Sequence, residues 1–348
     1  MSDKIQSIRG MHDFAPEEAS TMRMLENKLI EALNSYAYQE IRTPLVEKLD
    51  LFKRSIGEVT DIVEKEMYAF EDRGGDWLAL RPEGTAGTVR AGIQHGWLHN
   101  QQQRFWYMGP FFRRERPQKG RYRQFHQLGV ETYGFAGPDI DVELILLTQS
   151  MWNAVELNDD NLELQINSLG DADARAEHRK QLISYLSDYE NDLDDDARRR
   201  LHSNPLRILD SKNPEVQAIV KNAPMLMDYL NDEALQHFEK LKDLLTQLEI
   251  NFVVNPSLVR GLDYYNRTVF EWITHELGAQ GTICAGGRYD SLIEQVGGRA
   301  TLAAGFALGL ERLYSLVESR MTEQKRTIDV YMLALGEQTF PIALKIAN

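Results

Sequence analysis

Two apolar segments joined by a short basic loop constrain the fold of this chain most. Segments 105–112 and 125–135 are rich in aromatic and β-branched residues, and a loop over 113–123 separates them. This pattern predicts a β-hairpin, and segments 66–71 and 76–81 around Arg73-Gly74-Gly75 predict a second one. Because hairpin strands pair antiparallel, we predict an α+β fold with a mainly antiparallel sheet flanked by helices, not a doubly wound fold.

Hydrophobic periodicity and turn residues predict the remaining elements. Apolar residues at helical spacing predict helices over 16–36, 139–155 and 304–319. The first of these opens with Pro16 and two acids, which suit a helix N-terminus. Short strands are expected at 41–45, interrupted by Pro44, and at 252–254, 267–273 and 280–284.

A change in composition divides the chain into parts. Residues 171–250 are rich in charged residues and leucine, carry helical periodicity and are broken by three prolines. This predicts a helical insertion between two parts of one catalytic domain, residues 1–170 and 251–320. A linker is expected near 318–326. Residues 328–335 are expected to form the first strand of a C-terminal α/β domain, of which 327–348 would be an incomplete start.

Charge and cysteine content exclude several classes of protein. The formal net charge of −14 argues against nucleic-acid binding over the whole surface. A single cysteine, Cys284, excludes an internal disulfide and a zinc site of several thiolates. No apolar run reaches the roughly 18 residues of a membrane span. Residues 1–18 lack the apolar region of a secretory signal, so we expect a cytoplasmic protein.

Residues 113–123 differ in charge from the rest of the chain. Their net charge is +5, from six cations against Glu115. The cations are Arg113, Arg114, Arg116, Lys119, Arg121 and Arg123. This segment is either a solvated loop or a local site for an anion.

Two common nucleotide-binding motifs are missing. The chain has neither a G-x-x-x-x-G-K-[ST] run nor a G-x-G-x-x-G segment after a strand, which disfavours a Walker-type site and a dinucleotide fold. His275-Glu276 lacks the second histidine of a zinc-protease helix. If the chain binds a nucleotide, arginines on the sheet have to hold its phosphates.

Two segments place polar groups where a small ligand could bind. Residues 81–85, Arg-Pro-Glu-Gly-Thr, lie at a predicted strand-to-helix turn, where Glu83 either starts the helix or holds an ammonium group. Strand alternation puts Gln127, Gly129 and Glu131 on one face. Because an acid and an amide suit a core poorly, this face predicts the floor of a pocket for a small polar ligand.

Two later segments combine glycines, arginines and aromatic residues. Residues 258–265, Leu-Val-Arg-Gly-Leu-Asp-Tyr-Tyr, would by themselves form a surface loop with aromatic packing. Residues 285–290, Ala-Gly-Gly-Arg-Tyr-Asp, are accompanied by 304–313. In the predicted helix, Gly305 and Gly309 would allow close approach of a neighbour or a ligand. Arg312 lies on the following turn, where an isolated arginine usually forms a surface ion pair.

Together these segments resemble the histidyl-tRNA synthetase family of the class II aminoacyl-tRNA synthetases. Residues 109–131 resemble motif 2 of the class, and 305–312 resemble motif 3. The region around 41–44 is similar to the weaker motif 1, a dimer element. Residues 260–265 and 285–290 resemble two segments peculiar to the family. The resemblance runs in order from residue 8 to about residue 320.

The resemblance implies a reaction and its partners. The protein would activate L-histidine with ATP to histidyl-adenylate and pyrophosphate, then transfer histidine to the 3′ end of tRNA(His). It would act as a homodimer without membrane association. Magnesium would bind mainly through the oxygens of ATP and pyrophosphate, with no metal site built by the protein.

The resemblance also implies roles for individual residues. Those implied to bind histidine are Glu83, Thr85, Gln127, Glu131, Tyr264, Tyr265 and Tyr289. Those implied to bind ATP are Arg113, Arg121, Phe125 and Arg312, with Arg113 and Arg260 as catalytic groups at the α-phosphate. Those implied to meet the tRNA acceptor end are Arg116, Gln118 and Arg123.

One other class resembles the same catalytic domain, the regulatory subunit of ATP phosphoribosyltransferase, which lacks an anticodon-binding domain. Arg113, Arg260 and Arg312 favour the synthetase, because a regulatory subunit needs no phosphate-binding set. A pure tRNA-binding module would need the basic loop but not Glu83 or Arg260. The stop at Asn348 departs from the family, and we expect it to leave activation intact and to weaken tRNA charging.

Overall fold

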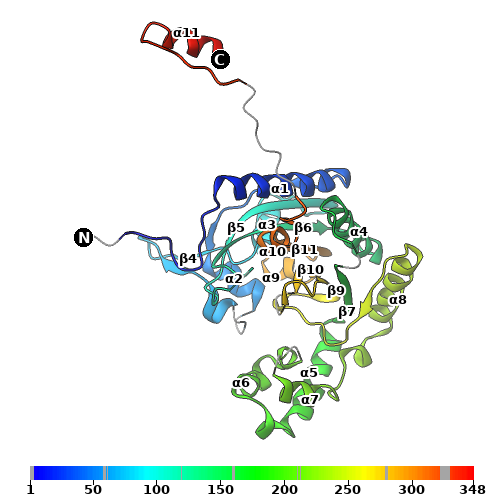
Figure 1. Cartoon of the computed structure of the whole chain (residues 1–348). Helices are drawn as coiled ribbons and strands as arrows, with labels where there is room; N and C mark the ends of the chain where they lie inside the picture. Colours follow the sequence, from blue (N-terminus) through cyan, green and yellow to red (C-terminus); the bar gives the residue numbers. More distant parts are fainter. Residues whose placement is uncertain are drawn as a thin grey trace.

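An eight-stranded sheet forms the centre of the molecule (Figure 1). The computed structural model describes residues 4–57, 60, 62–118, 120–158, 161–209, 211, 213–278, 281–321 and 330–348. In sheet order the strands are β1 Gln39–Glu40, β5 Gln103–Phe112, β6 Gln124–Tyr133, β11 Ala303–Gly309, β10 Thr282–Arg288, β9 Asn266–Ile273, β7 Glu163–Ser168 and β8 Val253–Val254. The five inner pairings are antiparallel and the two outermost are parallel. The α+β prediction and the β5–β6 hairpin are confirmed.

Helices cover one face of this sheet. They are α1 Pro16–Ser35, α4 Pro138–Ala154, α8 Asp232–Gln247 and α10 Leu310–Val317, and their apolar faces share one core with the strands. Leu128 and Val130 of β6 point into that core. Because strand side chains alternate, Gln127 and Glu131 point to the opposite face, as predicted. The helices expected over 16–36 and 139–155 are confirmed by α1 and α4.

Smaller elements lie over the opposite face. A three-stranded sheet contains β2 Val46–Lys48, β4 Trp77–Leu80 and β3 Ala69–Glu71, in that order. The β3–β4 pair confirms the second predicted hairpin. With it lie α2 Leu49–Ile56, a π-helical turn Ile62–Glu66, α3 Thr85–Gln94 and α9 Leu292–Gln295.

Residues 172–229 form a helical unit with its own core. It contains α5 Ala172–Ser187, α6 Asp195–Ser203, α7 Pro214–Val220 and three 3-10 turns, at Glu190–Asp192, Pro205–Ile208 and Leu226–Tyr229. Leu182, Leu201 and Val216 are among the residues that form this core. In contrast, α8 lies in the same predicted insertion but packs Phe238 and Leu241 into the main core. The boundaries 171 and 250 remain predictions.

The helix predicted to begin at Ala304 is wrong for its first six residues. Residues 303–309 form β11, and the helix α10 begins only at Leu310. Backbone groups of β11 pair with β6 on one side and β10 on the other. Two partner strands satisfy this backbone in the middle of the sheet, so the extended conformation outweighs local helical preference. Gly305 and Gly309 are therefore strand residues.

Two predicted strands are also wrong. Residues 41–45 are not a strand; they connect β1 to β2. Pro44 has no N–H with which to join a β-ladder, but the N–H of Ile41 still donates to the Trp106 carbonyl at 2.8 Å. In the predicted strand 328–335, residues 330–335 are not a strand, and no described segment pairs with them. Some predicted positions lie outside the described residues: Lys119, residue 280, most of the predicted linker and residues 327–329.

The last element is α11, Phe340–Ala347, whose large apolar side chains are exposed.

Candidate active site

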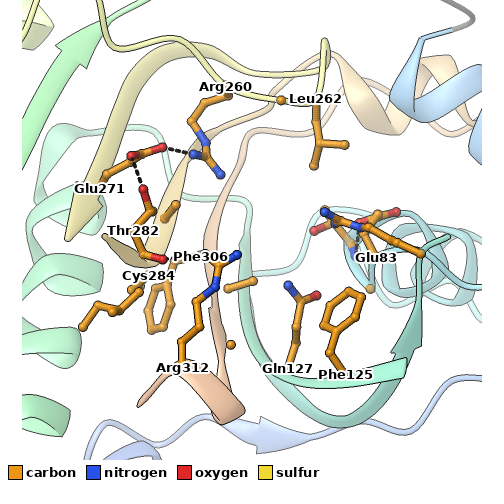
Figure 2. A pocket seen from close by; sticks show the side chains of 18 of the residues that line it. Glu83, Phe125, Gln127, Arg260, Leu262, Glu271, Thr282, Cys284, Phe306 and Arg312 are labelled. Atoms are coloured by element: carbon orange, nitrogen blue, oxygen red, sulfur yellow. Dashed lines mark hydrogen bonds and ion pairs between the residues drawn. The ribbon is translucent and has the colours of Figure 1, made fainter. Parts of the chain in front are cut away.

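A cavity of about 290 Å³ opens on the face of the sheet opposite the α1–α4 layer (Figure 2). It is bordered by β6, β9, β10 and β11, by the start of α3 and by the loop before β9. The predicted residues that line it are Glu83, Thr85, Arg113, Arg121, Phe125, Gln127, Glu131, Arg260, Tyr264, Tyr265 and Arg312. Four motifs far apart in sequence therefore meet at one site.

Glu131 is the centre of a buried hydrogen-bond cluster at one end of the cavity. Its side chain is 1% exposed. Oε1 accepts hydrogen bonds from the hydroxyls of Thr85 at 2.8 Å and Tyr107 at 3.0 Å, and Oε2 accepts one from Tyr289. Burial raises the pKa of Glu131 to about 8, although the three hydroxyl donors oppose this shift. A group of this kind can exchange a proton near neutral pH and can accept a hydrogen bond from a ligand.

Tyr289 belongs to this cluster although it does not line the cavity wall. Its ring packs against the predicted residues Tyr264 and Tyr265, with centroids 5.6 and 6.2 Å away. Tyr264 and Tyr265 are themselves 4.7 Å apart. All three rings are buried. The segment 258–265 is thus not a surface loop at its tyrosines.

Tyr107 is a member of this cluster that the sequence analysis missed. It lies on β5 opposite Gly129 of β6. A Cβ on Gly129 or on Gly84 would come within 3.0 Å of the Tyr107 ring. The two glycines therefore make room for the tyrosine that donates to Glu131. The sequence signal that could have identified Tyr107 is its pairing, in the predicted hairpin, with a glycine on the polar face of the second strand.

Glu83 caps the start of α3. Its Oε2 accepts from the Thr85 amide at 2.6 Å and its Oε1 from the Ala86 amide at 3.0 Å. This geometry satisfies two of the free N–H groups at the helix start and places a negative charge at the positive end of the helix dipole. The helix-start role left open by the sequence is confirmed. Because each carboxylate oxygen accepts more than one hydrogen bond, the same group can also face a cationic ligand.

Arginines supply the positive charge of the cavity. Arg113 donates from Nε to the Pro82 carbonyl at 2.8 Å. Arg312 donates to the carbonyls of Gly120 at 3.0 Å and Thr282 at 2.7 Å, so it is not an exposed surface ion pair. Burial, together with repulsion from Arg121 and Arg113, lowers the pKa of Arg312 to about 10. Several partly buried cations at one site indicate that the cavity suits a strongly anionic ligand.

Two side chains complete the arginine side of the cavity. Arg260 pairs with Glu271, which in turn accepts from the Thr282 hydroxyl at 3.0 Å; neither partner was identified from the sequence (Figure 2). The Phe125 ring lies 5.4 Å from the Arg113 guanidinium and borders the cavity. An aromatic face beside a cation can stack on a flat, electron-rich ring.

The basic loop divides into exposed and anchored residues. Arg116 and Gln118 are exposed. Arg123 is half-buried and donates to the carbonyls of Glu115 at 3.2 Å and Arg9 at 3.3 Å. The structure therefore gives Arg123 a part in holding the loop against residues 9–10, which the sequence did not indicate.

Two absences concern the part of the chain that the structure describes. Within it, no group of three or more His, Cys, Asp or Glu side chains is arranged to hold a metal ion. Nor does any of its helices have the length and apolar character needed to cross a bilayer. Cys284 lies at the cavity, where burial raises the pKa of its thiol.

Known proteins are similar to this chain in sequence and in fold. The profile of the family described as histidyl-tRNA synthetase matches residues 10–313. The apo S. aureus histidyl-tRNA synthetase structure is 35% identical, with a TM-score of 0.79 over 99% of this chain and 82% of that one. A Bacillus halodurans protein, described as an ATP phosphoribosyltransferase regulatory subunit/histidyl-tRNA synthetase, is 23% identical over 91% of this chain and 84% of that one, with a TM-score of 0.67. The second likeness shows the fold alone. By profile and by identity, this chain belongs to the histidyl-tRNA synthetase family.

Proposed function

We propose that this chain activates L-histidine with ATP, forming histidyl-adenylate and pyrophosphate, and then transfers histidine to the 3′ end of tRNA(His). One observation supports this most: a buried carboxylate cluster around Glu131 and four arginines line the same cavity. The first suits a small polar amino acid and the second suits a polyphosphate. A histidine–tRNA ligase needs both at one place.

Histidine would bind beside Glu131. An imidazole has two ring nitrogens, and each requires a partner. Glu131 and Tyr265 would supply them, with Tyr264 and Tyr289 enclosing the ring. A site that hydrogen-bonds its substrate rejects analogues lacking those groups by roughly 10⁴–10⁵. Such a pocket makes a separate editing site unnecessary.

The ammonium group of histidine would be held at the start of α3. Glu83, Thr85 and Gln127 line the cavity next to the Glu131 cluster. Glu83 keeps its two backbone hydrogen bonds there, so its carboxylate is fixed before the ligand arrives. Fixing the group in advance lowers the entropy cost of binding.

The arginines would bind ATP and stabilise the transition state. In the first step the histidine carboxylate attacks the α-phosphorus, a P–O bond forms, and pyrophosphate leaves as the bond to the β-phosphate oxygen breaks. Both reactants are anionic, so Arg113 and Arg260 at the α-phosphate would offset their repulsion. Arg121 and Arg312 would hold the remaining phosphates. Phe125 would stack on adenine.

Magnesium would enter with ATP. It prefers oxygen ligands and keeps several waters when phosphates hold it, and we propose that ATP and pyrophosphate supply most of its ligands. In the second step the terminal ribose hydroxyl of tRNA attacks the activated carbonyl and AMP leaves. A phosphate oxygen of the adenylate is our candidate for accepting the hydroxyl proton.

The remaining partners are proposals on the same basis. Arg116, Gln118 and Arg123 would meet the acceptor end of tRNA, and the protein would work as a cytoplasmic homodimer. The catalytic domain would comprise 1–170 and 251–320, with 171–250 as an insertion and 327–348 as the start of an anticodon-binding domain. The alternative is a regulatory subunit of ATP phosphoribosyltransferase. The clustering of Arg113, Arg260 and Arg312 at one cavity favours the ligase.

Amino-acid-dependent exchange of pyrophosphate into ATP tests the proposal. Each of the twenty amino acids is supplied separately, without tRNA. We expect exchange with histidine only. Absence of exchange with every amino acid would favour the regulatory subunit, and exchange with a different amino acid would overturn the assignment of the Glu131 pocket.

A further inference from the structure

Glu271 lines the cavity and has no role in the reaction proposed above. It lies on β9 between Phe270 and Trp272, which point into the main core. Strand alternation therefore turns Glu271 toward the cavity, and its side chain is 14% exposed. Its carboxylate accepts from Arg260 Nη1 and, at 3.0 Å, from the Thr282 hydroxyl of β10 (Figure 2).

Besides its ion pair with Glu271, Arg260 interacts with the side chain of Tyr265. It lies in the loop between β8 and β9, outside any helix or strand. Its Nε is buried and has no hydrogen-bond partner among the described residues. Its guanidinium lies 5.5 Å from the Tyr265 ring. Arginine has a long side chain with many rotamers, so a fixed anchor on a strand decides where the guanidinium points.

The bonding pattern leaves part of Arg260 available. Glu271 engages Nη1, while Nε has no partner among the described residues and can donate to a ligand in the cavity. Thr282 holds the second oxygen of Glu271, so the carboxylate is itself fixed to the sheet. The chain of contacts runs from Thr282 of β10 through Glu271 to Arg260, and under the proposed function it would end at the α-phosphate of ATP.

We infer that Glu271 is a positioning residue, which fixes Arg260 for the transfer of the adenylyl group without touching the substrate itself. This inference rests on the proposed function. It requires that Glu271 act through Arg260 alone, which a double-mutant cycle can measure.

The first test compares Glu271→Ala and Glu271→Gln in single-turnover formation of histidyl-adenylate. Loss of the outer hydrogen-bond partner of a metal ligand typically costs about 10- to 100-fold in activity, and we apply the same range to the partner of a catalytic arginine. We expect Glu271→Ala to lower the rate by about that factor, with the KM for histidine unchanged within about twofold. Glu271→Gln keeps an acceptor for Arg260 and should retain most of the rate. Glu163→Ala, on neighbouring β7 and outside the cavity, is the matched control and should have no effect.

The second test places Glu271→Ala in an Arg260→Ala background. If Glu271 acts through Arg260, the double variant should be no slower than Arg260→Ala alone. A further loss of about tenfold in the double variant would overturn the inference, as would an equal rise in the KM for histidine. A tenfold rise in the Mg²⁺ concentration needed by Glu271→Gln would overturn it too, because Glu271 would then be a metal ligand.

The outcomes separate this inference from the function it rests on. If the unmodified protein shows no histidine-dependent exchange, the proposed function fails and Glu271 is not the cause. If exchange occurs and Arg260→Ala abolishes it while Glu271→Ala is unaffected, the proposed function stands and the positioning role fails. Thermal unfolding of each variant shows whether a lost rate reflects a lost fold.

Discussion

Gly305 of β11 lies directly against the carboxylate of Glu131 on the paired strand β6. A Cβ at residue 305 would come within 3.0 Å of Glu131 Oε2 and of the Val130 carbonyl oxygen. The position of the buried Glu131 carboxylate therefore depends on the absence of a side chain at residue 305. A glycine on β11 leaves the space in which Glu131 accepts its hydrogen bonds from Thr85 and Tyr289.

Gly305→Ala should therefore damage both stability and histidine use. Backbone atoms of β6 cannot move aside cheaply, and overpacking of this kind typically costs about 1–3 kcal/mol. We expect a loss of that size in the free energy of unfolding, measured in urea, and a KM for histidine raised at least about tenfold. Gly309→Ala is the control in the same strand, because its Cβ would meet only Arg312 at 3.9 Å. Equal unfolding free energies for the two variants would contradict this account.

Glu131 should make stability depend on pH. Its folded pKa, about 8, lies above the unfolded value of 4.5. The stabilising contribution is therefore complete below about pH 4.5 and is lost as the pH rises through 8. Glu131→Gln stays neutral, so it should match the unmodified protein near pH 4 and exceed it near pH 9, by on the order of 5 kcal/mol in the limit. Unfolding free energies at both pH values, with Glu163→Gln as control, measure this. A constant difference between the two proteins would exclude the raised pKa.

Arg288 should matter for stability more than for binding. It is 1% exposed and donates from Nε to Asp141 Oδ2 at 3.1 Å and from Nη2 to the Gly137 carbonyl at 2.6 Å. Removing one partner of a buried ion pair costs about 3–5 kcal/mol, and we expect the lower part of that range here because Asp141 keeps its contacts with His237 at 2.6 Å and Thr268 at 2.8 Å. Arg288→Ala should lose that much in urea unfolding. Adding Asp141→Asn to Arg288→Ala should recover part of the loss, and a further full loss would show that the two side chains are independent.

Arg116 should act on RNA alone. It is exposed on the basic loop and does not line the cavity. Arg116→Ala should weaken tRNA binding and reduce the slope of log K against log salt by roughly 0.7–0.9, as expected for one lost phosphate contact. Pyrophosphate exchange without tRNA should be unchanged. Lys4→Ala, a change of the same charge outside the loop, serves as the control; an unchanged salt slope in Arg116→Ala would remove this residue from the RNA site.

Local patterns in the sequence were sufficient for most elements and for the polar face of β6. The β5–β6 hairpin depends on neighbouring residues, and alternation along one strand places Gln127 and Glu131 together without reference to the rest of the chain. The helix-start role of Glu83 follows from residues 83–86 alone. For these features the deciding interactions are between residues that are close together in the chain, so local sequence patterns predict them.

The tertiary structure decided what depends on partners far away in the chain. Residues 303–309 have no local signal that separates strand from helix, because short apolar runs fit both; pairing with β6 and β10 on both sides makes them a strand. Tyr107 and Glu271 look like ordinary strand residues until Glu131 and Arg260 lie beside them. Residues 83, 131, 260 and 312 come from four separate segments, and only the packed sheet brings their charges into one cavity, where burial changes their chemistry.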